Sequence, residues 1–144
     1  MSYTIDANLL LYASDAASPW HGRAVELVKQ VARGPEIAYV FWPTVMAYLR
    51  IATHPAVVAH PLPADEAIGN IEQLLGRPHV QTPGEREQFW DRYREVARDG
   101  KAAGNLVSDA HLVALMMEND VRTIWTHDRD LRRFNGIVVR DPFE

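Results

Sequence analysis

The stretch YTIDANLLLYA, residues 3–13, places one acidic residue, Asp6, between two apolar runs. Residues 3–5 are aromatic or β-branched, which predicts a buried strand that ends at Asp6. Residues 8–13 then predict the beginning of a helix. An ionised carboxylate buried without a partner is costly, so Asp6 is expected to be protonated, paired or bound to a metal ion. Its partner must come from another part of the chain.

The next segment, SPWHGRAVELVKQVARG, has apolar residues at helical spacing. Ser18 is its expected N-cap, Pro19 its first helical residue and Gly34 its stop. A short apolar strand over 36–41 follows. The chain therefore begins with an alternation of strands and helices.

This alternation continues to the end of the sequence. Three further helices are expected, the first from Pro43, the second over 64–75 and the third opened by a capping box between Thr82 and Glu85. A fourth begins near Leu106. The helix from Pro43 is expected to bury Val45, Met46, Leu49 and Ala52. The helix over 64–75 is expected to bury Ala67, Ile68, Ile71, Leu74 and Leu75. Short strands are expected over 79–81, 122–126 and 136–140.

Short apolar strands that alternate with helices indicate a parallel sheet covered on both faces. We therefore predict an α/β fold, a three-layer α/β/α sandwich with a mainly parallel central sheet. With 144 residues, the chain is expected to form one domain over 1–144. Sites in such folds lie beyond the carboxyl ends of the strands.

Composition excludes several classes of site. The chain has no cysteine, which rules out disulfides, thiol nucleophiles and cysteine-based metal sites. The formal net charge of −4 argues against a broad basic surface but leaves room for a local basic rim. No signal-peptide pattern or membrane-spanning run is found, so the expected location is the cytoplasm.

Two further aspartates are expected to approach Asp6. Asp128 comes two residues after Thr126, at the carboxyl end of the strand over 122–126. Asp109 lies near the beginning of its helix, and Asn105 is one turn earlier on the same face. Crowded carboxylates repel one another unless a cation neutralises them, and oxygen ligands suit Mg²⁺ or Mn²⁺. Asp6 is therefore predicted to be a metal ligand.

Four motifs, in this order, carry a family resemblance: IDANLLLYA, WPTVMAYLRIATHP, GNLVSDAHLVAL and THDRDLRRFNGIVV, the last followed by DP. The chain resembles PIN-domain ribonucleases, and more narrowly VapC-type toxins of type II toxin–antitoxin pairs. The resemblance covers nearly the whole chain. It implies a Mg²⁺-dependent endoribonuclease that hydrolyses RNA phosphodiester bonds, is neutralised by a VapB-like antitoxin and forms a homodimer.

The resemblance also implies roles for individual residues. Asp6, Asp109 and Asp128 are the expected catalytic, metal-binding acids. Side chains expected behind the ligands or on the substrate side are Asn8, Asn105, Thr126, Asp130 and Arg50. Arginines expected to grip the RNA backbone are Arg50, Arg129, Arg132 and Arg133.

The chain departs from the family pattern at one position. Such domains usually carry a fourth acid, a glutamate in the helix after the second strand, where this chain has Ala47 and Tyr48. The lower negative charge favours one tightly held Mg²⁺ rather than two.

Other interpretations of the same residues stay open. Asp6 and Asn105 could cap helices, Asp109 could favour the positive end of its helix dipole, and Asp128 could be a turn residue. Two alternative functions are a catalytically weak PIN module that binds RNA or protein, and a receiver-like or phosphatase-like domain. The latter lacks a lysine after the last strand, where Arg140 stands.

Overall fold

The computed structural model describes residues 1–144 and is built on a five-stranded parallel sheet. The strand order is β3-β2-β1-β4-β5. The strands are β1 (Ser2–Ile5), β2 (Ile37–Tyr39), β3 (Val80–Gln81), β4 (Thr123–Trp125) and β5 (Val138–Arg140). The order differs from the 2-1-3-4-5 order of flavodoxin-like sheets, to which receiver domains belong. The predicted parallel sheet is confirmed, and the receiver-like alternative is wrong.

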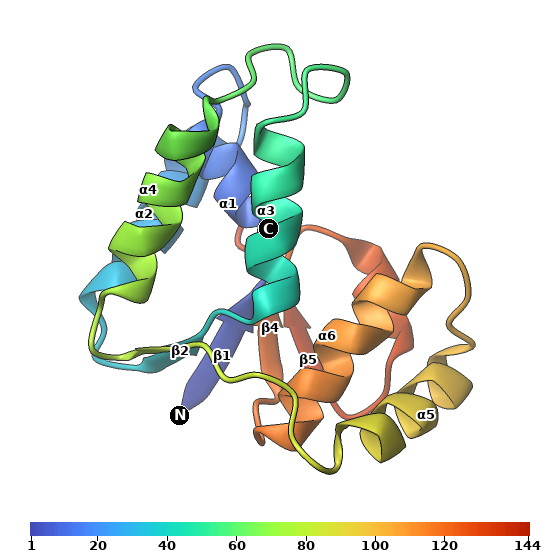
Figure 1. Ribbon diagram of the computed structural model, residues 1–144. Coiled ribbons are helices and arrows are strands. Elements are labelled where there is room, and N and C mark those ends of the chain that lie inside the picture. Colours follow the sequence, from blue (N-terminus) through green and yellow to red (C-terminus); the bar gives the residue numbers. More distant parts are fainter.

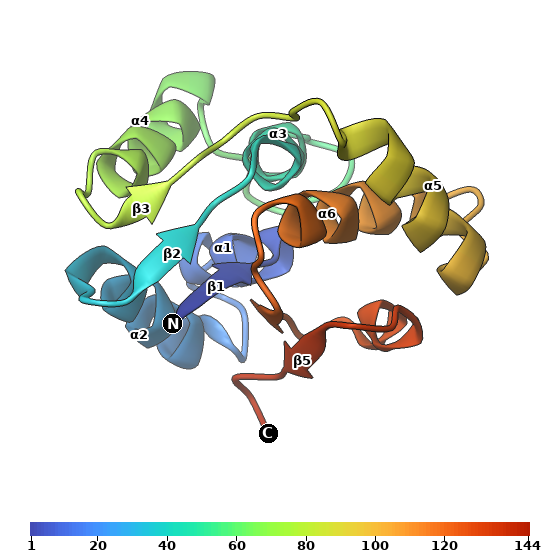
Figure 2. The ribbon, with the colours of Figure 1, turned by 90° about the horizontal axis from the view of Figure 1, so that it is seen from below.

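Helices cover the sheet on both sides (Figures 1 and 2). They are α1 (Ala7–Ser14), α2 (His21–Arg33), α3 (Trp42–Ala52), α4 (Ala64–Leu75), α5 (Phe89–Gly100) and α6 (Leu106–Glu118), with a 3₁₀ turn, η1 (Arg129–Arg133), between β4 and β5. Figure 2 shows α3, α4, α5 and α6 on one side of the sheet and α2 on the other. The three-layer prediction is thus confirmed. None of these helices has the length and apolar character needed to cross a membrane.

The buried apolar side chains form two clusters. The first joins β1 to α1, α2, α3 and α4, and Ile5 and Leu9 are fully buried in it. The second lies under α5 and α6 and includes Ile124 of β4 and Leu131 of η1. Each large side chain buried in this way stabilises the fold by about 1.5–3 kcal/mol. The neighbouring strands β1 and β4 thus contribute their buried side chains to different clusters.

The ends of β1 and β4 lie side by side. Ile5 is in register with Trp125, and the backbone N–H of Asp6 donates to the Trp125 carbonyl at 3.0 Å. Strand order reverses at β1, because β2 lies on one side of it and β4 on the other. Such a switch point is where ligands bind in open parallel sheets. Asp6 and Thr126 therefore directly follow their strands at this edge.

The predicted beginning of α2 is wrong by two residues. Ser18 does not cap the helix, because its hydroxyl accepts a hydrogen bond from the backbone N–H of Trp20 at 3.1 Å and closes a turn. Pro19 lies in that turn, and the helix begins at His21. The predicted end at Gly34 is confirmed.

The capping box predicted between Thr82 and Glu85 does not form, and α5 begins only at Phe89. The Glu85 carboxylate accepts from Nε2 of His111 at 2.7 Å instead of reaching back to the chain. The next residue, Arg86, donates its backbone N–H to Glu118 at 3.0 Å. Contacts with α6 therefore hold this segment extended.

The buried faces of α3 and α4 differ from the apolar faces that the sequence predicts. Met46 is 55% exposed, and Ile68 of α4 is also exposed. The buried positions of α3 include Thr44 and Tyr48, which the apolar pattern does not predict. Tyr48 can be buried because its hydroxyl bonds to Ser14 at 2.7 Å and accepts from the Asn70 amide at 3.0 Å.

Candidate metal centre

Asp6 stands where β1 turns into α1, and both of its carboxylate oxygens are hydrogen-bonded. Oδ1 accepts from the backbone N–H of Ala7 at 2.7 Å, and Oδ2 accepts from the Thr126 hydroxyl at 2.8 Å. Asp6 is thus the N-cap residue of α1, as one of the alternative interpretations predicted. Burial raises the pKa of Asp6 above its ordinary value despite these hydrogen bonds, and the charge of Asp128 adds to the increase.

Thr126 joins the two strand ends. Its side chain is 1% exposed, donates to Asp6, and accepts from the backbone N–H of Asp128 at 2.9 Å. The Asn8 amide lies 3.4 Å from the same hydroxyl oxygen. A hydroxyl has one proton and two lone pairs, so these contacts use its full capacity. Asn8 and Thr126, both expected behind the ligands or on the substrate side, thus lie beside Asp6.

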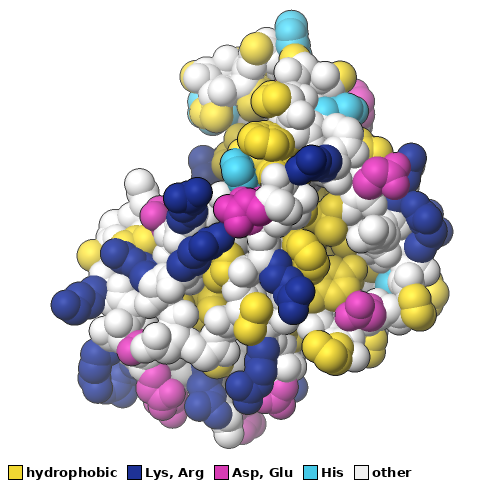
Figure 3. Space-filling model, turned by 180° about the vertical axis from the view of Figure 1, so that it is seen from behind, with side chains coloured by type: hydrophobic (Ala, Val, Ile, Leu, Met, Phe, Trp, Pro, Cys, Tyr) yellow, Lys and Arg dark blue, Asp and Glu magenta, His cyan; other side chains and the backbone are white.

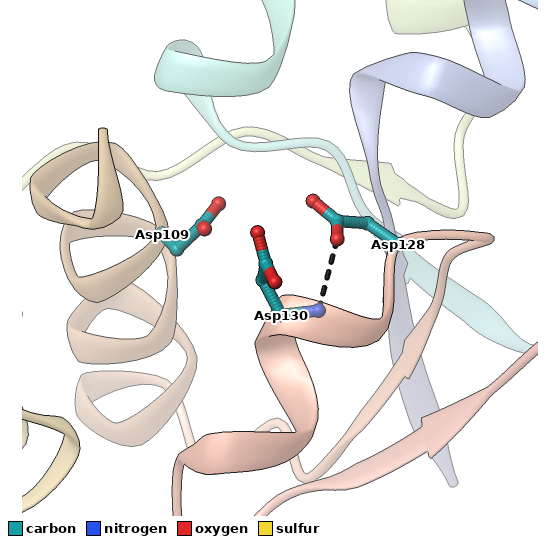
Figure 4. Close-up of side chains that lie close together, drawn as sticks. All are labelled: Asp109, Asp128 and Asp130. Carbon is teal, nitrogen blue, oxygen red and sulfur yellow. Dashed lines mark hydrogen bonds between the residues drawn. The ribbon is translucent and has the colours of Figure 1, made fainter.

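Three aspartates converge next to this network (Figure 4). Carboxylate oxygens of Asp109, Asp128 and Asp130 all lie within 4.8 Å of one another. Asp109 comes from the first turn of α6, and the other two come from the beginning of η1. Asp128 Oδ1 accepts a hydrogen bond from the backbone N–H of Asp130 at 2.9 Å. This hydrogen bond fixes the turn and brings the Asp130 carboxylate into the cluster.

The electrostatics of Asp109 favour a cation. Burial, together with the charges of Asp6, Asp128 and Asp130, raises the pKa of Asp109 to about 6. The positive charge of Arg133 partly opposes this increase. Repulsion between neighbouring carboxylates is what a bound cation relieves. The cluster is therefore short of positive charge.

The donor set fits a hard divalent cation. All the cluster's ligand atoms are carboxylate oxygens, the type that Mg²⁺ and Mn²⁺ prefer. Asn8 Oδ1 is buried beside Thr126 without a hydrogen-bond partner. A buried amide oxygen in such a place is normally satisfied by water or an ion. No histidine belongs to the cluster.

The predicted and observed sets of acids differ in two respects. Asp130, expected behind the ligands or on the substrate side, belongs to the cluster, whereas Asp6 lies outside it and is linked through Thr126 and through its charge. The inclusion of Asp130 depends on the 3₁₀ turn, for which the spacing of the two aspartates in HDRD is the only sequence signal.

Two other predicted residues make no hydrogen bond or ion pair with these acids. Asn105 occupies the N-cap position of α6, but it is exposed and its side chain forms no capping hydrogen bond. Arg50 is exposed in the last turn of α3. At the position of the missing fourth acid, Ala47 is partly buried and Tyr48 points toward Ser14 and Asn70.

A contact that the sequence does not suggest lies beside Asp128. Nδ1 of His127 is 2.8 Å from a carboxylate oxygen of Asp141, beyond the last strand. The ring also packs on Trp20 and Phe143. The only sequence signal for the contact between His127 and Asp141 is the DP pair that follows the last strand.

Comparisons with known proteins agree with this geometry. Ribonuclease VapC48 of Mycobacterium tuberculosis is 50% identical over 143 residues, which cover 99% of each chain. Among solved structures, VapBC-1 of nontypeable Haemophilus influenzae matches with a TM-score of 0.70 at 19% identity, over 100% of both chains. VapC20 of M. tuberculosis, described as a sarcin–ricin loop cleaving toxin, matches with a TM-score of 0.67 at 16% identity, over 94% of this chain and 96% of that one. No protein-family model matches the chain.

Proposed function

Because this chain belongs to the VapC family of ribonucleases, we propose that it is a divalent-metal-dependent endoribonuclease toxin that hydrolyses RNA phosphodiester bonds. The observation that carries the proposal is the convergence of Asp109, Asp128 and Asp130 at the carboxyl edge of the sheet (Figure 4). We also propose that residues 1–144 act as one domain and that the protein works in the cytoplasm.

The acids have separate tasks in this proposal. Asp109 and Asp128 hold the cation, and Asp130 adds a third carboxylate from the turn that Asp128 caps. Asp6 acts as a further ligand, because each of its oxygens accepts one hydrogen bond and keeps a second lone pair. Thr126 holds Asp6 and the backbone of Asp128 in a fixed relation.

Mg²⁺ or Mn²⁺, when bound, supplies positive charge that polarises the phosphate and favours deprotonation of water. Hydrolysis adds a water molecule across one P–O bond and leaves one phosphate end and one hydroxyl end. The chain's own residues align the reacting groups, which is where much of the rate enhancement of such sites arises. With no glutamate on α3, we propose one cation rather than two.

Arginines beside the acids are the proposed contacts for the RNA backbone. Arg129 and Arg132 are exposed on η1 and only loosely paired with Glu144, at 3.9 and 3.8 Å. Arg133 forms no ion pair and acts electrostatically on Asp109. Figure 3 shows Lys and Arg side chains gathered on the side of the molecule where Figure 1 places α5 and α6. This basic rim suits a polyanion despite the negative net charge.

We infer that a VapB-like antitoxin neutralises the protein. The chain has a largely apolar groove of about 340 Å³ between α1, α2, α3 and α4. Its lining includes Leu10, Val28, Leu62 and Ile71. Grooves of this kind accept an amphipathic helix. The solved neighbour from H. influenzae is itself a VapBC structure.

We also propose a homodimer. Trp42 and Met46, one turn apart on α3, are 41% and 55% exposed. Large exposed apolar side chains at helical spacing are typical of a surface that is covered by a partner.

The test is cleavage of total cellular RNA by the purified protein with Mg²⁺ or Mn²⁺, with EDTA, and with Asp109→Asn and Asp6→Asn. Discrete cuts that require metal and vanish in both variants are expected. Asp120→Asn is the matched control, because Asp120 is exposed and its positive φ of 55° suits asparagine. RNA binding without cleavage by the wild type would instead support the catalytically weak binding module.

A further inference from the structure

His127, the residue before Asp128, is packed in a cluster of aromatic rings. Its own ring lies against Trp20, Phe143 and Tyr12, with centroid distances of 5.0, 5.1 and 6.3 Å. Trp20 and Phe143 stack on each other at 4.7 Å. Aromatic pairs at such distances attract one another beyond the effect of the area they bury. The ring is thus held by residues from α1, from the turn before α2 and from the C-terminal segment.

Asp141 fixes the orientation of this ring. Its side chain is 5% exposed, and Oδ2 lies 2.8 Å from Nδ1 of His127. Its other oxygen accepts the backbone N–H of Phe143 at 2.9 Å, and the Arg23 guanidinium donates to the Phe143 carbonyl at 2.8 Å. The carboxylate is acceptor-only when ionised, so Nδ1 carries the proton in this contact. The segment Asp141–Phe143 is therefore tied to α2 and to His127.

Hydrogen bonds on both sides of His127 hold the backbone that leads to Asp128. On one side, the Thr126 hydroxyl accepts the N–H of Asp128 at 2.9 Å. On the other, the N–H of Thr126 donates to the Arg140 carbonyl at 2.9 Å, one residue before Asp141. The position of the Asp128 carboxylate therefore depends on two anchors, one in the acidic network and one in the C-terminal segment.

We propose that His127 and Asp141 are positioning residues, which hold the loop between β4 and η1 so that Asp128 keeps its place beside Asp109. Neither residue belongs to the acidic cluster. Partners that orient metal ligands without touching the metal change its affinity by about 10–100-fold when they are removed. The inference rests on the proposed function for its effect on the metal, and on the fold alone for its effect on the loop.

Three variants test the proposal. His127→Ala removes the ring and its hydrogen bond, whereas His127→Asn keeps an N–H group near the position of Nδ1 and can still donate to Asp141. His111→Ala is the matched control, because it breaks a histidine–carboxylate contact of similar length, 2.7 Å to Glu85, that does not involve this loop. If His127→Ala does not fold, Asp141→Asn takes its place, since it removes the charge and keeps the shape.

The first measurement is hydrogen exchange of the Asp128 amide by NMR without metal, and the second is Mn²⁺ affinity by calorimetry. We expect His127→Ala to exchange at least about 10-fold faster and to bind Mn²⁺ about 10-fold more weakly. His127→Asn and His111→Ala should resemble the wild type in the exchange rate of the Asp128 amide and in Mn²⁺ affinity.

The exchange data decide the proposal by themselves. The positioning proposal is wrong if the Asp128 amide exchanges at the wild-type rate in folded His127→Ala. It is also wrong if His127→Asn and His127→Ala accelerate this exchange equally. Failure of the wild type to bind Mn²⁺ would count against the proposed metal-dependent function, while the exchange comparison would still test the positioning of the loop.

Discussion

The hydroxyl of Thr126 donates to the Asp6 carboxylate at 2.8 Å, across 120 positions of the chain. This hydrogen bond joins the end of β1 to the end of β4 and fixes one oxygen of a partly buried acid.

Thr126→Val should disrupt the centre while keeping its shape. The substitution leaves Asp6 Oδ2 without its donor and the Asp128 N–H without its acceptor. Buried groups left unsatisfied in this way cost about 1–3 kcal/mol. We expect a decrease of that size in the free energy of unfolding, measured with urea, and RNA cleavage that is slower by at least about 10-fold. Thr126→Ser keeps both hydrogen bonds and is the control; an equal decrease in Thr126→Ser would show that the methyl group matters instead.

Asp109 should make the metal-free protein less stable as the pH rises. Its pKa is raised from 3.8 to about 6, so between these values the folded chain binds more protons than the unfolded chain. The free energy of unfolding in EDTA should therefore fall from about pH 4 to about pH 7, by about 1–2 kcal/mol after allowance for solvent screening.

Metal and mutation should both change this pH dependence. Saturating Mg²⁺ binds the ionised carboxylate, so it should raise the melting temperature more at about pH 7 than at about pH 5. Asp109→Asn should flatten the EDTA profile over the same range. An unchanged slope in that variant would assign the effect to other groups.

Arg133→Ala should weaken RNA binding through charge. Removing one cation from the phosphates of single-stranded RNA lowers the slope of log affinity against log salt by about 0.7. We expect that change by filter binding with the Asp109→Asn variant as background, so that cleavage does not interfere. Arg33→Ala, at the end of α2, is the control of equal charge. Equal slopes for the two variants would show that Arg133 does not contact the RNA backbone.

Gly100→Ala should destabilise the contact between α5 and the segment after η1. A Cβ atom at this position would lie 2.4 Å from the ring of Phe134, which is buried in the second core cluster. Overpacking of this kind costs about 1–3 kcal/mol. Gly69→Ala in α4 meets nothing within 4 Å and should stabilise by up to about 1 kcal/mol, which makes it the control. Similar melting temperatures for the two variants would contradict the close packing.

Local sequence patterns predict the acidic edge well. Asp6 and Asp128 each follow a short apolar strand, and parallel strands end at one edge, so their approach needs no knowledge of distant contacts. The inclusion of Asp130 was not predictable, because it depends on a 3₁₀ turn closed by the Asp128 side chain. The beginning of α5 was not predictable either, because His111 takes the carboxylate of Glu85 that a capping box requires.

The hydrogen bond between Thr126 and Asp6 also has a consequence for synthesis. Translation is vectorial, so a nascent chain that has emerged only as far as α6 holds Asp6 and Asp109 but neither Thr126 nor Asp128. Folding of β1 and of helices α1 to α4 on the ribosome therefore leaves the centre incomplete. The acidic centre is therefore assembled only after Thr126 and Asp128 have left the exit tunnel.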